Sequence, residues 1–232
     1  MVEIFNAGVE RLRDELVSEC DITVVAGVSN REDKAMCEAY GYHTTSISNE
    51  ALGLKMNLIL EEATTIEADY YMQMGSDNLV SVDWVRQAMK QIDLGADMVA
   101  DRSLYFIDLY SWRACHYTYW TPDLNLCGAC RLFAPHAIET MRDKAGGLLM
   151  WPDDAERGLD GKSEGLFKEM GNKVEVNTVE GDKHHLIDIK SEVNLWDFER
   201  FYNTTNRMDV TECTWFCSPT EIEYLYTNGN LD

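Results

Sequence analysis

The chain has 232 residues, of which 45% are hydrophobic and 26% charged, with 41 acidic against 20 basic side chains. This length and composition are typical of one globular α/β domain and exclude an intrinsically disordered protein. The formal net charge of −21 argues against a broad nucleic-acid-binding surface, because such surfaces depend on clustered Lys and Arg.

The first part of the chain alternates between strand-like and helix-like hydrophobic periods, which indicates successive β and α units. Short β-branched runs predict the strands, and apolar positions at helical spacing predict the helices. In chain order the pattern predicts a helix over 4–17, a strand over 21–28, a helix over 31–40, a strand over 42–47, a helix over 50–64, a strand over 68–74 and a helix over 81–94.

The second part is less regular, and an aromatic-rich stretch over 108–130 is interpreted as a hairpin. Around it the pattern predicts a strand over 97–107, helices over 135–145 and 159–171, and a strand over 173–179. A last helix is expected to begin at Ser218, because Ser218 and Glu221 form a capping box around Pro219 at the first helical position. The expected fold class is α/β, with a mostly parallel sheet flanked by helices.

The turn Gly75-Ser76-Asp77-Asn78 follows the strand predicted over 68–74. Ligands of open α/β sheets bind beyond the carboxyl ends of the strands, so this turn is the place where chemistry is expected. Mg²⁺ and Mn²⁺ prefer carboxylate and carbonyl oxygens, and such an ion can neutralise a diphosphate leaving group. Asp and Asn are also common in ordinary turns, which is the alternative interpretation.

The residues that precede this turn, together with the turn itself, resemble a known family. The stretch that includes Asn49, Lys55, Asn57 and Asp69, followed by Gly75-Ser76-Asp77-Asn78, is similar to the nucleotide-sugar-binding half of the GT-A glycosyltransferases, nearest to their inverting family-two group. The resemblance covers roughly residues 4–200. It implies a GT-A-like (Rossmann-like) fold and a nucleotide-diphosphate sugar as the donor substrate.

The resemblance also implies roles for individual residues. Asp77 would be the principal ligand of a manganese or magnesium ion, with Asn78 standing where these enzymes more usually carry Asp. Asp160, at the start of a helix, matches the position where these enzymes carry their catalytic acidic residue. A carboxylate there can act as a base and accept the proton of an acceptor hydroxyl. Helix N-capping is the alternative role for Asp160.

Other candidate residues follow from the same resemblance. The late metal ligand would be His184 or His185, and Lys190 would hold donor phosphate. Surface or core positions are the ordinary alternatives for these three residues. The remaining nucleotide-sugar contacts suggested by the resemblance are Asn49, Lys55, Ser76 and Arg131.

The sequence departs from the family pattern at both ends. GT-A domains normally open with a strand whose following loop binds the nucleotide base, whereas this sequence is expected to start in the helix after that strand. We expect residues 1–202 to form the GT-A-like domain and residues 203–232 a C-terminal extension with a short helix.

Compartment and cysteine chemistry can also be predicted. The sequence has no run of 18 apolar residues and no secretory signal, so we expect no transmembrane segment and a cytoplasmic setting. The seven irregularly spaced cysteines fit a reducing compartment. A zinc site built from Cys127, Cys130, Cys213 and Cys217 is a minor alternative, because the first pair sits in an apolar segment typical of buried packing.

The sequence thus predicts a metal-dependent transferase that moves a sugar from a nucleotide-diphosphate sugar to a carbohydrate or other hydroxyl acceptor. Three alternatives stay open: a nucleotidyltransferase of related fold, a non-catalytic carbohydrate- or protein-binding relic, and transfer of sugar to a modified base of viral DNA. The last conflicts with the acidic surface. The sequence does not indicate the oligomeric state.

Overall fold

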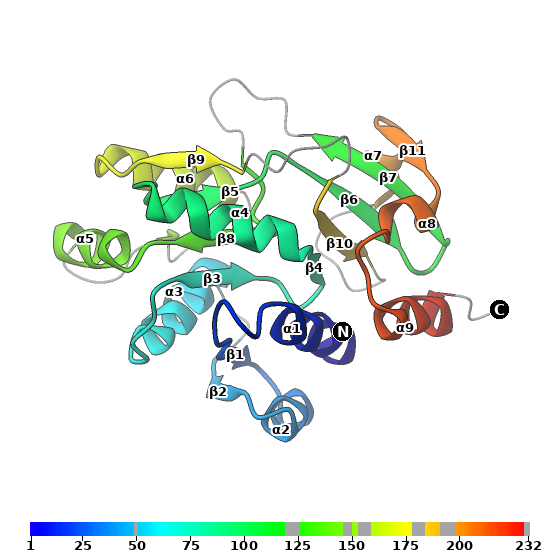
Figure 1. Cartoon of the computed structure of the whole chain (residues 1–232), viewed down its shortest axis with the longest axis horizontal. Helices are drawn as coiled ribbons and strands as arrows, with labels where there is room; N and C mark the ends of the chain where they lie inside the picture. The colour runs from blue at the N-terminus through cyan, green and yellow to red at the C-terminus, as the bar shows by residue number, and fades with distance from the viewer. Residues whose placement is uncertain are drawn as a thin grey trace.

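The computed structural model describes residues 1–48, 51–118, 126–145, 150–152, 159–177, 184–190 and 198–229, with the backbone alone at 144–145, 159–161 and 200. Helices and strands alternate along the first part of the chain (Figure 1). The helices are α1 (Val2–Glu15), α2 (Arg31–Ala39), α3 (Leu52–Ala63), α4 (Val82–Asp93), α5 (Pro135–Ala145), α6 (Leu159–Glu169), α7 (Phe198–Tyr202), α8 (Val210–Cys213) and α9 (Pro219–Gly229).

The strands form three hydrogen-bonded sheets in the described residues. The orders are β1-β2, β3-β8-β5-β9 and β11-β7-β6-β10-β4. The strands are β1 (Val25–Val28), β2 (His43–Ser46), β3 (Tyr71–Met74), β4 (Asn78–Val80), β5 (Met98–Ala100), β6 (Ser103–Asp108), β7 (Arg113–Thr118), β8 (Cys130–Phe133), β9 (Val174–Val176), β10 (Leu186–Lys190) and β11 (Asn206–Met208).

The two-stranded sheet is a βαβ unit, with β1 and β2 parallel and α2 between them in the chain. Asn30 caps α2, because its side chain accepts a hydrogen bond from the Asp33 amide at 2.8 Å. Gly41, with a φ of 75°, lets the chain turn after this helix at a conformation that costs other residues energy. The predicted strands and helices of this part are therefore present, with shorter bounds.

The expectation of a mostly parallel sheet is wrong, because the sheets are mixed. β8 runs antiparallel to both β3 and β5, while β5 and β9 are parallel. In the five-stranded sheet only the β10–β6 pair is parallel. Sequence periodicity gives the type of an element but not the direction of its partner, which explains the error.

The single strand expected over 97–107 is in fact two strands in different sheets. Asp101 ends the first strand, because its carboxylate accepts hydrogen bonds from the amides of Arg102 at 2.7 Å and Ser103 at 3.3 Å. The chain then continues as β6 and returns through β7, so the hairpin spans 103–118 rather than the 108–130 that the sequence predicted, and 119–125 lie outside the described residues. A side chain that bonds its own local backbone competes with strand pairing at that point.

The main core lies between α4 and the four-stranded sheet. Trp84 of α4 is fully buried, as are Phe133 of β8, Trp151 and Phe167 of α6. Burial of large aromatic side chains is the main favourable contribution to such a core. A second cluster under the five-stranded sheet gathers Leu79, Ile107 and Ile187 with α8 and α9.

The C-terminal segment packs onto the rest of the chain. β11 pairs with β7, and α9 lies against α1 (Figure 1). Arg11 of α1 donates to the Glu221 carboxylate of α9 at 2.8 Å, and Glu221 is completely buried. Ser218 and Glu221 form the expected capping box, since each side chain accepts from the other's amide. In the part of the chain that the structure describes, no helix has both the length and the apolar character needed to span a membrane.

Candidate functional site

The turn after β3 brings two side-chain oxygens together over Gly75. A Cβ atom built on Gly75 would lie 2.6 Å from Asp77 Oδ1 and 2.6 Å from Asn78 Oδ1. Both oxygens therefore approach one point, which the missing side chain of Gly75 leaves open. Asn78 Oδ1 also accepts a hydrogen bond from the Gly75 amide at 3.0 Å, which fixes the amide group of this buried residue.

The β4–β10 ladder fixes what lies beside this turn. The amide of Ile189 donates to the Asp77 carbonyl at 2.7 Å, and Asn78 is paired with Asp188. Directly opposed residues of antiparallel strands place their side chains on the same face. Asn78 and Asp188 are therefore neighbours on one face of the sheet, although 110 positions separate them in the chain.

Asp188 and Lys190 form an ion pair beside Asn78. The Lys190 ammonium lies 2.7 Å from the Asp188 carboxylate and 4.8 Å from the centre of the Phe106 ring, and only 5% of Lys190 is exposed. A buried ammonium needs such a partner, because desolvation is costly for an unpaired charge. The sequence analysis did not single out Asp188. Its two-residue spacing from Lys190 could have indicated the pair, because residues two apart in a strand have their side chains on the same face.

His184 belongs to a different cluster. Its Nδ1 lies 2.7 Å from Ser103 Oγ, and its ring stacks on His116 with centroids 3.8 Å apart. Burial lowers the pKa of His184 to about 4, and the neighbouring His116 and His185 add to this effect. His184 is therefore neutral at physiological pH, and its ring contacts Ser103 of β6 and His116 of β7.

His185 lies at the other end of the β4–β10 pairing from Asp77. Its Nδ1 lies 2.6 Å from the hydroxyl of Ser81, the N-cap residue of α4, and its carbonyl accepts from the Ser81 amide. Burial lowers the pKa of His185. The contact thus ties β10 to the start of α4.

Neither histidine is placed beside Asp77. The Asp77 carbonyl accepts a hydrogen bond from the Ile189 amide, and Ile189 follows His185 by four residues. Because a strand advances about 3.3 Å per residue, His185 lies about 13 Å along β10 from the point where Asp77 pairs. Among the described residues no group of three or more His, Cys, Asp or Glu side chains is arranged to hold a metal ion. The cysteines of the minor zinc alternative are thiols, and burial raises the pKa of Cys130 well above its usual value.

Arg131 is a completely buried residue of β8. Its Nη1 donates to Ser163 Oγ of α6 at 2.8 Å. The side chain therefore anchors α6 to the sheet. α6 is also the helix that carries Asp160 as its second residue; the side chain of Asp160 lies outside the described part of the structure.

The remaining candidates lie on and around α3. Lys55 is half-buried on this helix; burial lowers its pKa, and the Asp33 carboxylate of α2 acts in the opposite direction. Asn57 is buried and holds the Trp151 segment, donating to the Trp151 carbonyl at 2.7 Å and accepting from its amide. Ser76 is exposed at the turn, and Asn49 lies outside the described residues.

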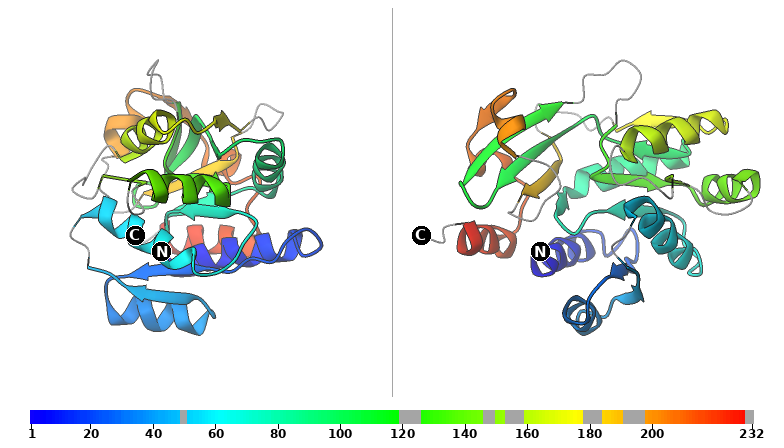
Figure 2. Two further views of the ribbon diagram at one scale, coloured as in Figure 1. Left: turned by 90° about the vertical axis from the view of Figure 1, so that its left-hand side faces the viewer. Right: turned by 180° about the vertical axis from the view of Figure 1, so that it is seen from behind.

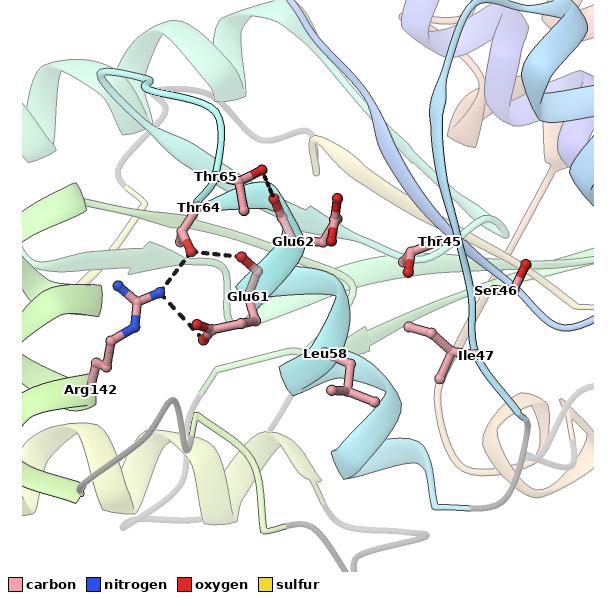
Figure 3. A pocket seen from close by; sticks show the side chains of 9 residues that line it. All are labelled: Thr45, Ser46, Ile47, Leu58, Glu61, Glu62, Thr64, Thr65 and Arg142. Atoms are coloured by element: carbon pink, nitrogen blue, oxygen red, sulfur yellow. Dashed lines mark hydrogen bonds and ion pairs between the residues drawn. The ribbon is translucent and has the colours of Figure 1, made fainter.

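Two hollows are present near the two-stranded β1-β2 sheet. One, of about 640 Å³, lies between β2 and the C-terminal half of α3; none of the predicted site residues lines it (Figure 3). Within it Arg142 donates to Glu61 and to Thr64, so its charge is already partnered. The other, of about 250 Å³, lies at the carboxyl ends of β1 and β2 and is lined by Arg31 and Lys34 at the start of α2.

Comparisons with known proteins give structural similarity only. No family model and no curated protein matches the sequence. A candidate nucleotide-diphospho-sugar transferase from Desulfovibrio desulfuricans G20 matches with a TM-score of 0.43 at 12% identity, over 99% of this chain and 86% of that one. A nucleoside-diphosphate-sugar pyrophosphorylase from Vibrio cholerae RC9 gives a TM-score of 0.46 at 13% identity, over 97% and 87%.

The inositol-1-phosphate CTP transferase from T. maritima gives a TM-score of 0.42 at 11% identity, over 75% of this chain and 72% of that one. TM-scores and sequence identities this low give no information about the activity of this chain. What the chain can do must therefore be argued from its own residues.

Proposed function

We propose that this protein is a metal-dependent glycosyltransferase that moves a sugar from a nucleotide-diphosphate sugar to an acceptor hydroxyl with inversion. The observation that carries the proposal is the approach of Asp77 Oδ1 and Asn78 Oδ1 to one point over Gly75. One carboxylate and one carboxamide oxygen are suitable donors for Mg²⁺ or Mn²⁺, which usually fill the remaining positions with water and phosphate oxygens.

The metal, when bound, would neutralise charge on the diphosphate leaving group. Asp77 and Asn78 would hold it, and Gly75 keeps their oxygens close together. Lys190 lies on the strand next to Asn78, where its ion pair with Asp188 holds the ammonium group in place. Lys55 of α3 is proposed as a further contact of the donor phosphate.

Asp160 is the proposed general base. A carboxylate there would accept the proton of the acceptor hydroxyl as that oxygen attacks the anomeric carbon and the bond to the nucleoside diphosphate breaks. The burial of Arg131 and its bond to Ser163 support this role, because they hold the helix that carries Asp160 against the sheet. His184 and His185 are left out of the proposed metal shell because of their distance from Asp77.

Calorimetry with uridine or guanosine diphosphate, with and without Mn²⁺, tests the metal site. Wild-type protein is expected to bind nucleotide only with the metal, and Asp77→Ala to lose this binding. Glu67→Ala, which removes an exposed carboxylate before β3, is the matched control and is expected to bind normally. Undiminished Mn²⁺-dependent binding by Asp77→Ala would contradict the proposal.

A panel of nucleotide sugars, read by release of nucleoside diphosphate, tests the reaction. Asp160→Asn is expected to keep metal-dependent binding and to lose at least about a hundredfold in turnover, the usual contribution of a general base. Pyrophosphate release from a nucleoside triphosphate would instead identify a nucleotidyltransferase. Absence of any metal-dependent binding would indicate a non-catalytic protein.

A further inference from the structure

Strand β10 has one apolar face and one polar face. It lies between β6 and β4, as Figure 1 and the reverse view of Figure 2 show. Ile187 and Ile189 are completely buried in the cluster under the five-stranded sheet. Side chains alternate between the two faces of a strand, so Asp188 and Lys190 share the opposite face. Asn78 is paired with Asp188 and therefore has its side chain on that face too.

The register of the β4–β10 ladder brings this polar face to the Gly75 turn. The Ile189 amide donates to the Asp77 carbonyl at 2.7 Å, so the turn runs alongside the end of β10. Opposed residues of an antiparallel pair have Cβ atoms about 4.5–5.5 Å apart. The carboxylate of Asp188 is therefore within side-chain reach of Asn78. The Oδ1 atom of Asn78 is one of the two oxygens that approach the point over Gly75.

The donor set proposed at this turn contains a single carboxylate. Asn78 contributes a neutral oxygen, which already accepts a hydrogen bond from the Gly75 amide at 3.0 Å. Mg²⁺ and Mn²⁺ are usually held by one or two carboxylates together with phosphate oxygens and water. Among the described residues, Asp188 is the carboxylate that strand pairing places opposite Asn78. A second carboxylate at this place would strengthen the attraction for a divalent cation.

Lys190 engages the Asp188 carboxylate in the structure. Its ammonium lies 2.7 Å from one carboxylate oxygen and 2.8 Å from the other, and 4.8 Å from the centre of the Phe106 ring. The pair is neutral as a unit, so neither charge acts on a ligand while the two side chains are joined. A divalent cation and a diphosphate carry the two complementary charges, and each would bind one member of the pair.

We propose that Asp188 is a ligand of the divalent cation and that it releases Lys190 to bind the diphosphate. In this exchange the Asp188 carboxylate leaves the ammonium for the cation, and the ammonium moves to a phosphate oxygen. One ion pair is replaced by two, and no covalent bond changes. The inference rests on the proposed function, because it uses the cation of the Gly75 turn. Asp188 thus takes the place in the metal shell that the sequence resemblance implied for His184 or His185.

Two single variants are expected to have opposite effects on the metal. Asp188→Asn should bind Mn²⁺ at least about tenfold more weakly, since even groups that only support metal ligands contribute about ten- to a hundredfold to affinity. It should bind uridine diphosphate without metal about tenfold more tightly than the wild type, because the freed ammonium gains one charge-assisted hydrogen bond.

Lys190→Met should change the affinities in the reverse direction. It is expected to bind Mn²⁺ more tightly, because no ammonium competes for Asp188, and to bind uridine diphosphate in the presence of Mn²⁺ more weakly. Calorimetric titrations with Mn²⁺ and with the nucleotide, each on the 232-residue protein, measure these affinities. Mn²⁺ affinity that falls in both variants, or in neither, would overturn the proposal.

Lys173 and Glu175 provide a matched control pair. They have the same two-residue spacing, beside β9, and their charged atoms lie 3.2 Å apart, but both side chains are exposed. Glu175→Gln is expected to leave the affinities for Mn²⁺ and for nucleotide unchanged. An equal loss of Mn²⁺ affinity in Glu175→Gln would show a general effect of removing one acidic group, and the role of Asp188 would be rejected.

A double variant separates a metal ligand from a pair needed only for folding. Asp188→Asn leaves a buried ammonium without its partner, which destabilises the protein. Asp188→Asn combined with Lys190→Met removes that charge, and its urea midpoint shows that it is folded. We expect this double variant to keep the weakened Mn²⁺ binding, because the ligand is still absent. Recovery of wild-type Mn²⁺ affinity would assign the pair to folding alone and overturn the proposal.

Asp77→Ala distinguishes this inference from the proposed function. Loss of Mn²⁺ binding in Asp77→Ala, together with unchanged binding in Asp188→Asn, would keep the turn as the metal site and exclude Asp188 from it. Unchanged Mn²⁺ binding in both variants would contradict the inference and the proposed function together.

Discussion

Gly75 determines how closely the oxygens of Asp77 and Asn78 approach each other. Any side chain at this position would occupy the point toward which both oxygens are directed. Interiors are packed closely enough that even one added methyl group must displace its neighbours. The chemistry proposed for this turn thus depends on a residue that contributes no ligand.

Gly75→Ala should therefore cost about 1–3 kcal/mol of unfolding free energy and lower Mn²⁺ affinity, because the methyl group pushes the two oxygens apart. Urea denaturation and calorimetry measure the two effects. Gly165→Ala on α6 is the control, since its new Cβ would meet nothing within 4 Å. That change should stabilise the helix by about 0.5–1 kcal/mol. Unchanged metal affinity in Gly75→Ala would exclude the turn as the metal site.

His184 makes stability depend on pH. Its pKa is about 4 in the folded chain and 6.5 in its ordinary state, so between these values the unfolded chain binds more protons. The contribution of neutral His184 to the free energy of unfolding is therefore complete above about pH 6.5 and is lost as the pH falls through about 4. His184→Gln should flatten the decline of the urea midpoint between neutral and mildly acidic pH.

His43→Gln is the control for this pH dependence, because His43 is exposed on β2. It should leave the slope unchanged. The buried neighbours His116 and His185, whose pKa values burial also lowers, contribute in the same direction. An unaltered slope in His184→Gln would assign the dependence to those two residues.

At the scale of elements, strand β10 connects regions that the sequence keeps apart. It pairs with β4 on one side and with β6 on the other. Its first part is tied to the start of α4 through His185, and its last part carries the Asp188–Lys190 pair beside Asn78. One short strand therefore positions two polar clusters at opposite ends of the same ladder.

Helix α9 depends on its capping box. Ser218→Ala removes the acceptor for the Glu221 amide and should cost about 1 kcal/mol of unfolding free energy, measured by urea denaturation. Thr220→Ala in the same turn is the control, since Thr220 is exposed and should change stability by less than about 0.5 kcal/mol. Equal losses in both variants would show that the turn responds to any truncation rather than to loss of the cap.

At the scale of the whole molecule, the first and last helices are joined by the buried Arg11–Glu221 pair. Arg11 also donates to the Val80 carbonyl at 2.7 Å, at the end of β4. The pair thus links α1, α9 and the strand that follows the Gly75 turn. The segment after residue 202 packs as part of the same structure.

Arg11→Met should destabilise the protein by about 3–5 kcal/mol, because it leaves the fully buried Glu221 without its charge partner. The double variant Arg11→Met with Glu221→Met should recover part of this loss, since no buried charge then remains unpaired. Urea denaturation of the two single variants and the double variant completes the cycle. A double variant as unstable as the sum of the two single variants would show that the residues do not interact.

The sequence by itself determined the type and order of most elements, because hydrophobic period and the Ser218 capping box act over a few neighbouring residues. It also singled out the Gly75 turn at a strand end. It did not predict β4, β10 or β11, which are short and gain their stability from partners far along the chain. The α/β class was predicted, but the mixed strand directions were not.

The tertiary structure alone decided which side chains meet. Asp188 and Lys190 lie beside Asn78, and His184 lies against Ser103, because strand pairing joins positions that are distant in the sequence. Local propensity carries no information about such pairing, whose register is fixed by burial of one strand face against the rest of the molecule.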